Sequence, residues 1–323
     1  MKLLALPLVL AAGTALAEAP EAGATAARAF LDGEAAALWD RMTPDLQAVL
    51  GTPQALRDLR TDLAAAFGTE TALLSTETRT EGAAQVFDRR SAWSGSDQPL
   101  QILVTLDSAG RVAGFLVRPV PQPADSPYLA YRTKADLHLP VTGDWQVIWG
   151  GRSIDQNYHA ADPGQRFALD LLVMRDGASH DGDPARRDSY HCWDQPILAP
   201  APGVVLRAED GLPDQPIGST DAGRPLGNHV VLDLGAGEYA FLAHLRQGSV
   251  AVAPGAEVTR GQRLGRCGNS GNSTEPHLHL HLQTTPELGR GFGLPAQFQD
   301  YVADGAAIAR GEPERGQAIR PAP

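Results

Sequence analysis

Apolar positions follow two patterns along the chain, a helical one near its start and an alternating one further on. Residues 18–68 are predicted to be helical, with apolar side chains on one face of the Ala-rich stretch 24–38. Thr52 and Pro53 form a typical start for a further helix, because a hydroxyl can cap it and proline is favoured at its first position. Gly68 is a suitable end for that helix.

Three strand-like segments follow the predicted helices, and a turn signal at 107–110 separates the last two. The segments are 84–94, 100–106 and 111–117. Helices followed by an antiparallel sheet predict a small α+β domain, which we place at residues 18–118. This stretch has no cluster of potentially catalytic side chains, so we expect it to have an accessory role.

Prolines mark the end of this domain, with Pro119, Pro121 and Pro123 opening a predicted linker at 119–134. Helical periodicity is nearly absent beyond the linker, where short strands alternate with Gly, Pro and Asp turns. This pattern predicts a β-rich domain of antiparallel sheets at 135–290. We expect the remaining tail, residues 291–323, to pack on that domain or extend from it. The candidate strands are 145–149, 167–173, 197–199, 203–207, 229–234, 239–244 and 277–283.

The last of these strands alternates histidine with leucine. Side chains point to opposite faces of a strand in turn, so His277, His279 and His281 share one face and the leucines share the other. Imidazole suits Zn²⁺ well, and several imidazoles on one strand face predict a metal site. The alternative is a histidine-rich surface strand.

Composition and the first residues bear on where the protein works. Residues 1–17 have the charge, the apolar run and the Ala-Leu-Ala site of a cleaved signal peptide, which predicts a periplasmic or secreted protein. The net charge is −11, and no basic run is present. An acidic chain of this kind is a poor binder of nucleic acids or anionic membranes.

The two cysteines, Cys192 and Cys267, allow several interpretations. A disulfide is the first hypothesis for an isolated pair in an exported protein. Two free thiols or a role in metal binding are the alternatives, because the sequence does not give the distance between the two residues.

Catalytic zinc takes three protein ligands, so the histidine strand needs partners. Asp170 lies within the apolar stretch 167–173, where a carboxylate is costly to bury unless it is paired or bound to a metal. A salt bridge to Arg166 or Arg175 is the alternative. His159 and His191 are the candidates for a third ligand, and spacing alone does not choose between them.

Five segments of the second domain, spread over residues 137–285, carry a resemblance to a known family. They are Ala199–Val205, Gly227–Val231, Ala243–Leu245, Gly261–Gly265 and Gly268–His279. In this order and spacing they resemble the lysostaphin/LytM-type zinc endopeptidases, which cut peptide bonds in bacterial cell-wall peptidoglycan. The first domain resembles nuclear-transport-factor-like domains through less specific features, namely Leu38–Met42, Thr52–Gly68 and Gly114–Val117.

The resemblance implies a role for each residue of the site. His279 and Asp170 are the implied zinc ligands, and His277 and His244 the implied catalytic histidines. The family's usual first ligand, a histidine four residues before the aspartate, is replaced by Arg166.

Some relatives carry instead an Asn-Tyr-His motif followed by Gln-Arg-aromatic-Ala-x-Asp, which matches 157–159 and 165–170. The resemblance therefore favours His159 over His191 as the remaining ligand. His281 is a second departure, at a position where the family commonly has glutamate. It is predicted either to support a ligand or to be exposed.

These interpretations together predict an exported zinc endopeptidase that acts on peptidoglycan peptides. In this mechanism zinc lowers the pKa of a bound water, and His277 and His244 move its proton and stabilise the oxyanion. One alternative is a catalytically inactive domain of the same fold that activates a cell-wall amidase. The other is a structural zinc module closed by His191 or a cysteine.

Overall fold

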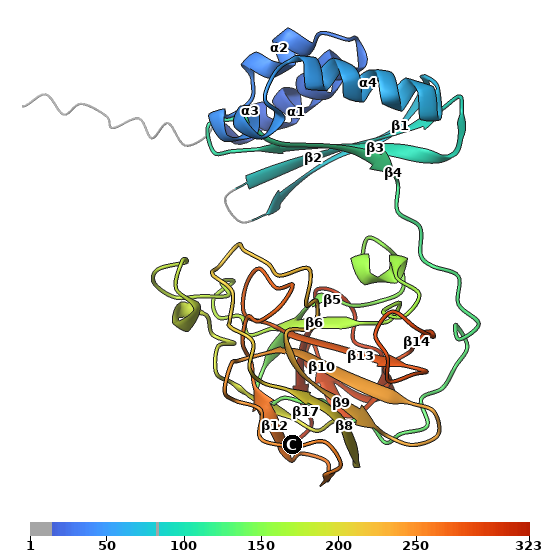
Figure 1. Cartoon of the computed structure of the whole chain (residues 1–323), viewed down its shortest axis with the longest axis vertical. Coiled ribbons are helices and arrows are strands. Elements are labelled where there is room, and N and C mark those ends of the chain that lie inside the picture. The colour runs from blue at the N-terminus through green and yellow to red at the C-terminus, as the bar shows by residue number, and fades with distance from the viewer. Residues whose placement is uncertain (1–14, 82–83) are drawn as a thin grey trace, which may run out of the picture. The chain divides into compact units, whose positions relative to one another are not determined.

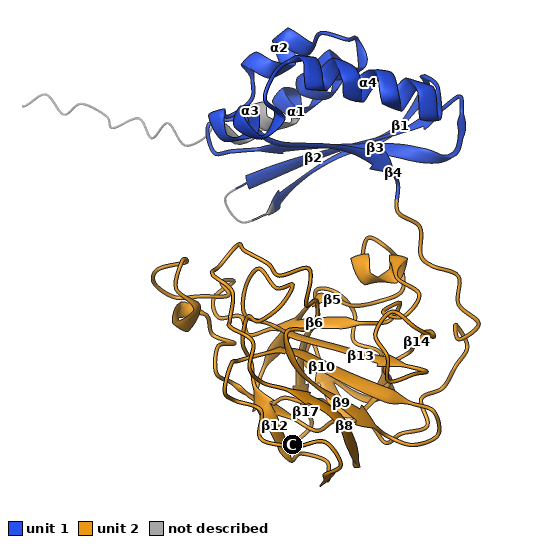
Figure 2. Ribbon diagram, viewed as in Figure 1, with its two compact units in different colours: residues 1–120 blue, residues 121–323 orange. Residues whose placement is uncertain are grey.

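The computed structural model describes residues 15–81 and 84–323, and the chain divides into two compact units, 1–120 and 121–323 (Figure 2). Residues 1–14 of the predicted signal peptide lie outside the described residues, and the remaining three begin the first helix. No helix in the described ranges combines the length and apolarity needed to span a bilayer.

The first unit consists of helices followed by one antiparallel sheet of order β1-β2-β3-β4, and the helices lie together on one face of that sheet (Figure 1). Its elements are α1 (Ala15–Leu31), α2 (Ala35–Asp40), α3 (Pro44–Leu50), α4 (Gln54–Phe67), β1 (Glu70–Glu81), β2 (Ala84–Trp93), β3 (Ser96–Leu106) and β4 (Val112–Pro119). Phe30 and Leu38 of the helices pack against Leu100, Ile102 and Val104 of β3 in its core.

The second unit is β-rich, and its strands pair antiparallel throughout. Its first strands are β5 (Trp145–Trp149), β6 (Leu169–Leu172), β7 (Pro196–Leu198), β8 (Gly203–Glu209), β9 (Asn228–Asp233) and β10 (Tyr239–Leu245). The later ones are β11 (Glu257–Val258), β12 (Arg263–Arg266), β13 (Leu278–Gln283), β14 (Gly293–Leu294), β15 (Phe298–Ala303), β16 (Ala306–Gly311) and β17 (Ala318–Pro321). Two short 3₁₀ helices, η1 (Tyr158–Ala161) and η2 (Arg187–Ser189), lie in its loops. The β-rich antiparallel architecture predicted from the alternating pattern is confirmed.

An eleven-stranded sheet of order β11-β8-β9-β10-β13-β6-β5-β17-β15-β16, with β14 beside β13, dominates the second unit (Figure 1). The histidine strand β13 lies between β10 and β6 near the middle of this order. Its leucines, Leu278, Leu280 and Leu282, are at most 1% exposed and belong to the main core. The leucine face therefore packs into the main core, and the histidines lie on the opposite face, where His279 and His281 are buried as well.

Cys192 and Cys267 form a disulfide, with Cα atoms 6.0 Å apart. Of the three interpretations of the cysteines, the disulfide is the one that the structure has. It ties the loop after η2 to the segment that precedes β13, and both sulfurs are thereby removed from the pool of possible metal ligands.

Candidate metal centre and catalytic histidines

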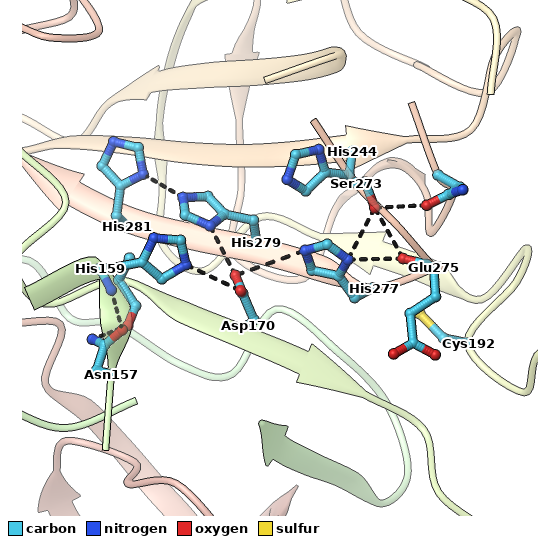
Figure 3. A network of polar contacts seen from close by, with 12 residues as sticks. Asn157, His159, Asp170, Cys192, His244, Ser273, Glu275, His277, His279 and His281 are labelled. Carbon is cyan, nitrogen blue, oxygen red and sulfur yellow. Dashed lines mark hydrogen bonds and ion pairs between the residues drawn. The ribbon is translucent and has the colours of Figure 1, made fainter. Parts of the chain in front are cut away.

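Three strands and one loop bring the predicted site residues together (Figure 3). His279 of β13 lies directly opposite Asp170 of β6 in the antiparallel register, and opposite Ala243 of β10 on its other side. Residues paired in this way share a face and have Cβ atoms about 5 Å apart. Register alone therefore places an imidazole beside a carboxylate across β13 and β6.

His159 completes this group from η1. Its Nε2 lies 3.0 Å from Asp170 Oδ2, and His279 Nδ1 lies 2.8 Å from Asp170 Oδ1. One ligand atom from each of the three residues lies within 4.8 Å of the others, and all three side chains are buried. In the described part of the chain, no other group of His, Cys, Asp and Glu side chains is arranged to hold a metal. His191 is not part of the group.

In this group the Asp170 carboxylate stays ionised although it is buried. Burial by itself raises the pKa of the Asp170 carboxyl, but the neighbouring His159 and His277, and hydrogen bonds with His159 and His279, hold that pKa well below its usual value. Burial lowers the pKa of His279, against the opposing effect of Asp170. An ionised carboxylate between imidazoles is a donor set that attracts a divalent cation. The ion-pair partners of Asp170 are histidines, and not the Arg166 or Arg175 of the alternative interpretation.

Asn157 holds the backbone of the His159 loop. Its side chain is fully buried and donates hydrogen bonds to the carbonyls of Ala168, at 2.9 Å, and Gly151, at 3.2 Å. Its Oδ1 accepts a hydrogen bond from the backbone N–H of His159 at 3.1 Å. The asparagine of the Asn-Tyr-His motif therefore joins the histidine to the start of β6, which carries Asp170.

Arg166 makes its contacts outside the group of His159, Asp170 and His279, which we call the metal group. Its guanidinium donates a hydrogen bond to the Arg152 carbonyl at 2.9 Å and lies over the Phe167 ring. Burial, with a smaller contribution from Arg152, lowers the pKa of Arg166. The residue that replaces the usual ligand thus supports the loop on which His159 is found.

The C-terminal segment supports the same loop from outside. Arg315 lies over the Trp149 ring at 4.3 Å and donates a hydrogen bond to the Asp155 carbonyl at 2.6 Å. Trp149 in turn packs edge-on against Tyr158, whose ring lies 4.0 Å from that of His159. A chain of ring contacts therefore connects the tail to a residue of the metal group.

His244 reaches the site through an irregularity of β10. Strict alternation places Ala243 on the His279 face and His244 on the core face. The register between β10 and β9 shifts between Leu242 and Leu245, and His244 has a φ of 61°, in the left-handed region. This bulge turns the His244 ring to within 5.7 Å of the His279 ring, so a strained backbone brings this histidine to the site.

The loops around residues 227 and 270 pack backbone against backbone beside His244. Gly227 has a φ of 57°, and a Cβ there would lie 2.4 Å from the Ser270 carbonyl. Gly271 has a φ of 79°, and a Cβ there would lie 2.3 Å from the Gly227 nitrogen. Glycine is therefore required at both positions for Ser270 to approach His244.

Both predicted catalytic histidines are fixed through Nδ1. His244 Nδ1 lies 2.9 Å from the Ser270 carbonyl oxygen, and His277 Nδ1 lies 2.9 Å from that of Glu275. A carbonyl only accepts, so each Nδ1 carries a hydrogen, and Nε2 keeps a lone pair wherever the ring is neutral. Burial, followed by the nearby His277 and His279, holds the pKa of His244 well below its usual value, so its ring is neutral.

The two rings lie together beside the metal group, with centroids 4.7 Å apart. His277 Nε2 is 3.8 Å from Asp170 Oδ1. Sequence reasoning missed Ser273, a buried residue whose Oγ lies 3.1 Å from His277 Nδ1. Nothing in the sequence pattern singles out this serine.

A pocket of about 400 Å³ opens at the site. His159, His244 and His279 contribute to its wall, together with Tyr158 and Leu288. The pocket is thus lined both by the metal group and by one of the two other histidines, an arrangement that allows a bound group to contact both.

His281 and His229 are placed differently. His281 is 1% exposed, with its Nδ1 2.9 Å from His279 Nε2. The exposed alternative for His281 is therefore wrong. Burial, and then His279, hold the pKa of His281 well below its usual value. His229 lies on β9, where its Nδ1 is 2.7 Å from the Gly227 carbonyl oxygen and burial lowers its pKa.

Part of the chain matches a known protein family. Residues 190–288 match the model of peptidase family M23. The match supports a peptidase and includes His244, His277 and His279. His159 and Asp170 lie before the matched residues, in the part of the second unit where the sequence departs from the usual ligand pattern.

A curated relative and solved structures add partial likenesses. The peptidoglycan DD-endopeptidase ShyA of Vibrio cholerae is 43% identical over 56 residues, which are 17% of this chain and 13% of that protein. The lysostaphin catalytic domain of Staphylococcus simulans is 20% identical, covering 43% of this chain and 78% of that one, with a TM-score of 0.27. A zinc-containing peptidase from Vibrio cholerae is 14% identical over 67% of this chain and 57% of that one, with a TM-score of 0.26.

Proposed function

We propose that the protein is an exported, zinc-dependent endopeptidase of the M23 type that hydrolyses peptide bonds in bacterial peptidoglycan. The substrate class follows from the ShyA likeness and from the motifs shared with lysostaphin/LytM-type enzymes. Export follows from the signal-like residues 1–17. For residues 18–118 we propose an accessory, nuclear-transport-factor-like domain.

One observation carries the proposal, namely the group formed by His159, Asp170 and His279. Two imidazoles and one carboxylate, buried and facing one another, fit a catalytic zinc site, which uses three protein ligands. The inactive alternative needed His159 to be away from this group and is not favoured. The structural-zinc alternative loses its cysteine ligands to the disulfide and has no support from His191.

The proposed reaction is hydrolysis of an amide. Zinc, when bound, lowers the pKa of the attacking water and polarises the scissile carbonyl. The unprotonated Nε2 of His244, or of a neutral His277, can take the proton of the water, and the ring that has gained this proton can then donate from Nε2 to the oxyanion. As the C–N bond breaks, the proton is passed to the leaving amine.

The lowered pKa of His244 keeps its ring unprotonated at neutral pH, which leaves Nε2 free to accept a proton. Ser270 and Glu275 hold the two rings through their carbonyl groups, so each imidazole meets the substrate in one tautomer. The pocket beside His159 and His244 receives the peptide, with Tyr158 and Leu288 as apolar walls.

The test combines metal content with digestion. The mature protein is purified, its zinc content is measured, and it is incubated with purified sacculi beside His279→Ala and His277→Ala variants. We expect about one zinc per chain in the wild type and in His277→Ala, much less in His279→Ala, and cleavage by the wild type alone. A zinc-free wild type contradicts the proposal, and zinc without cleavage favours a structural metal.

A further inference from the structure

His281 occupies the position where lysostaphin/LytM-type enzymes commonly have glutamate, and the structure buries it beside a proposed zinc ligand. Its Nδ1 is 2.9 Å from Nε2 of His279 (Figure 3). Its ring stacks on Phe241, the residue opposite it on β10, with centroids 4.4 Å apart and planes 12° apart. The stacking fixes the plane of the ring, so Nδ1 is aimed at His279.

The positions of the hydrogens on His279 and His281 follow from which ring nitrogen of His279 faces Asp170. Its Nδ1 faces Asp170, so that nitrogen must keep a lone pair if the group binds zinc. Nε2 of the neutral ring then carries the hydrogen and donates it to His281 Nδ1. As a consequence, the hydrogen of His281 is on its own Nε2.

Gln283 offers the acceptor that this tautomer needs. It lies two residues further along β13 and therefore on the same face. Its side-chain nitrogen is committed to the carbonyls of Thr285, Glu287 and Arg290, which fixes the direction of Oε1. His281 Nε2 and Gln283 Oε1 are both buried, and neither has a hydrogen-bond partner of standard geometry in the described chain. In this tautomer His281 Nε2 is a donor and Gln283 Oε1 is an acceptor.

We propose that His281, supported by Gln283, is a positioning residue that fixes the tautomer and orientation of His279, so that Nδ1 of His279 is presented to the metal. This inference rests on the proposed function. Ligating histidines generally donate their second N–H to an acceptor, and loss of that acceptor typically weakens metal binding by about 10- to 100-fold. In this chain the acceptor is the Nδ1 of an imidazole.

Zinc affinity, measured by competition with a chromophoric chelator, tests the inference without requiring activity. His281→Phe keeps a ring to stack on Phe241 but removes the acceptor, and we expect zinc to bind about 10- to 100-fold more weakly. His281→Asn returns an acceptor close to the position of Nδ1 and should restore most of the affinity. His229→Phe is the matched control, a half-buried histidine on β9 that is not part of the metal group, and should bind zinc as the wild type does.

The Co²⁺-substituted proteins give a second readout, because the visible spectrum reports the ligand field. We expect an altered spectrum for His281→Phe and a wild-type one for His281→Asn. Should His281→Phe fail to fold, His281→Leu replaces it, since Leu and Asn are similar in size and differ in the acceptor. Equal zinc affinity in the acceptor and non-acceptor variants overturns the inference. A wild type that binds no zinc removes the proposed function first, and the inference with it.

Discussion

Replacing Asn157 by alanine isolates the contribution of the loop that carries His159. The substitution removes hydrogen bonds of the fully buried Asn157 side chain to Ala168, to Gly151 and from the His159 backbone N–H. Each hydrogen bond contributes about 1 kcal/mol net, so we expect the free energy of unfolding to fall by about 3 kcal/mol. If all of this free energy serves to hold the His159 loop in place for the metal, zinc affinity falls by up to about 150-fold, since about 1.4 kcal/mol corresponds to a factor of ten.

Asn228→Ala is a matched control for this effect. Asn228 is also fully buried, donates to the carbonyls of Leu212 and Leu245, and accepts from the Leu212 N–H. Urea unfolding of the metal-free proteins and chelator competition are measured for both variants. Both should be destabilised by a similar amount, but zinc binding should weaken strongly only in Asn157→Ala. Unchanged zinc affinity in destabilised Asn157→Ala would show that Asn157 does not position His159 for the metal.

Three further predictions concern pH, the disulfide and the tail. The pKa values of His244 and His281 are lowered in the folded state, so unfolding of the metal-free protein takes up protons below about pH 6.5. Below that pH each histidine should reduce the free energy of unfolding by up to about 1.4 kcal/mol per pH unit, and a urea-unfolding profile that is flat between pH 7 and 5 argues against this effect. Replacing Cys192 and Cys267 by serine opens a loop with a sequence separation of 75 and should cost about 4.5 kcal/mol in the same assay, whereas no loss would show that the link is dispensable. Arg315→Ala removes the guanidinium over Trp149 and should weaken zinc binding about two- to fivefold by chelator competition, and unchanged binding would separate the tail from the site.

Period-two patterning was sufficient to predict the β-rich second unit and the two faces of β13. Leu278 and Leu280 are buried in the core, and His279 lies on the opposite face beside Asp170. The same reasoning did not predict β1, because Glu70–Glu81 is mostly polar and forms one edge of the first sheet, where neither face needs a continuous apolar row. Edge strands of this kind leave a weak sequence signal.

Local patterns could not supply the parts of the site that depend on irregular backbone. Strict alternation would place His244 on the core face, but a bulge and a positive φ turn the residue towards His279. His159 was favoured by its motif over His191, but the spacing carries no information on how η1 folds against β6. The support from Asn157 and Ser273 consists of hydrogen bonds with backbone and side-chain atoms that no periodicity encodes. The roles assigned to the site residues stay predictions for the zinc and digestion experiments.

Mass spectrometry of the fragments released from purified sacculi tests whether the protein is an endopeptidase. The zinc-loaded wild type and His277→Ala are compared, since the variant keeps the three proposed ligands. We predict wild-type fragments that arise by hydrolysis of a bond between two amino acids, and none of them from His277→Ala. Fragments cut between sugar and peptide, or the same fragments from both proteins, would contradict it.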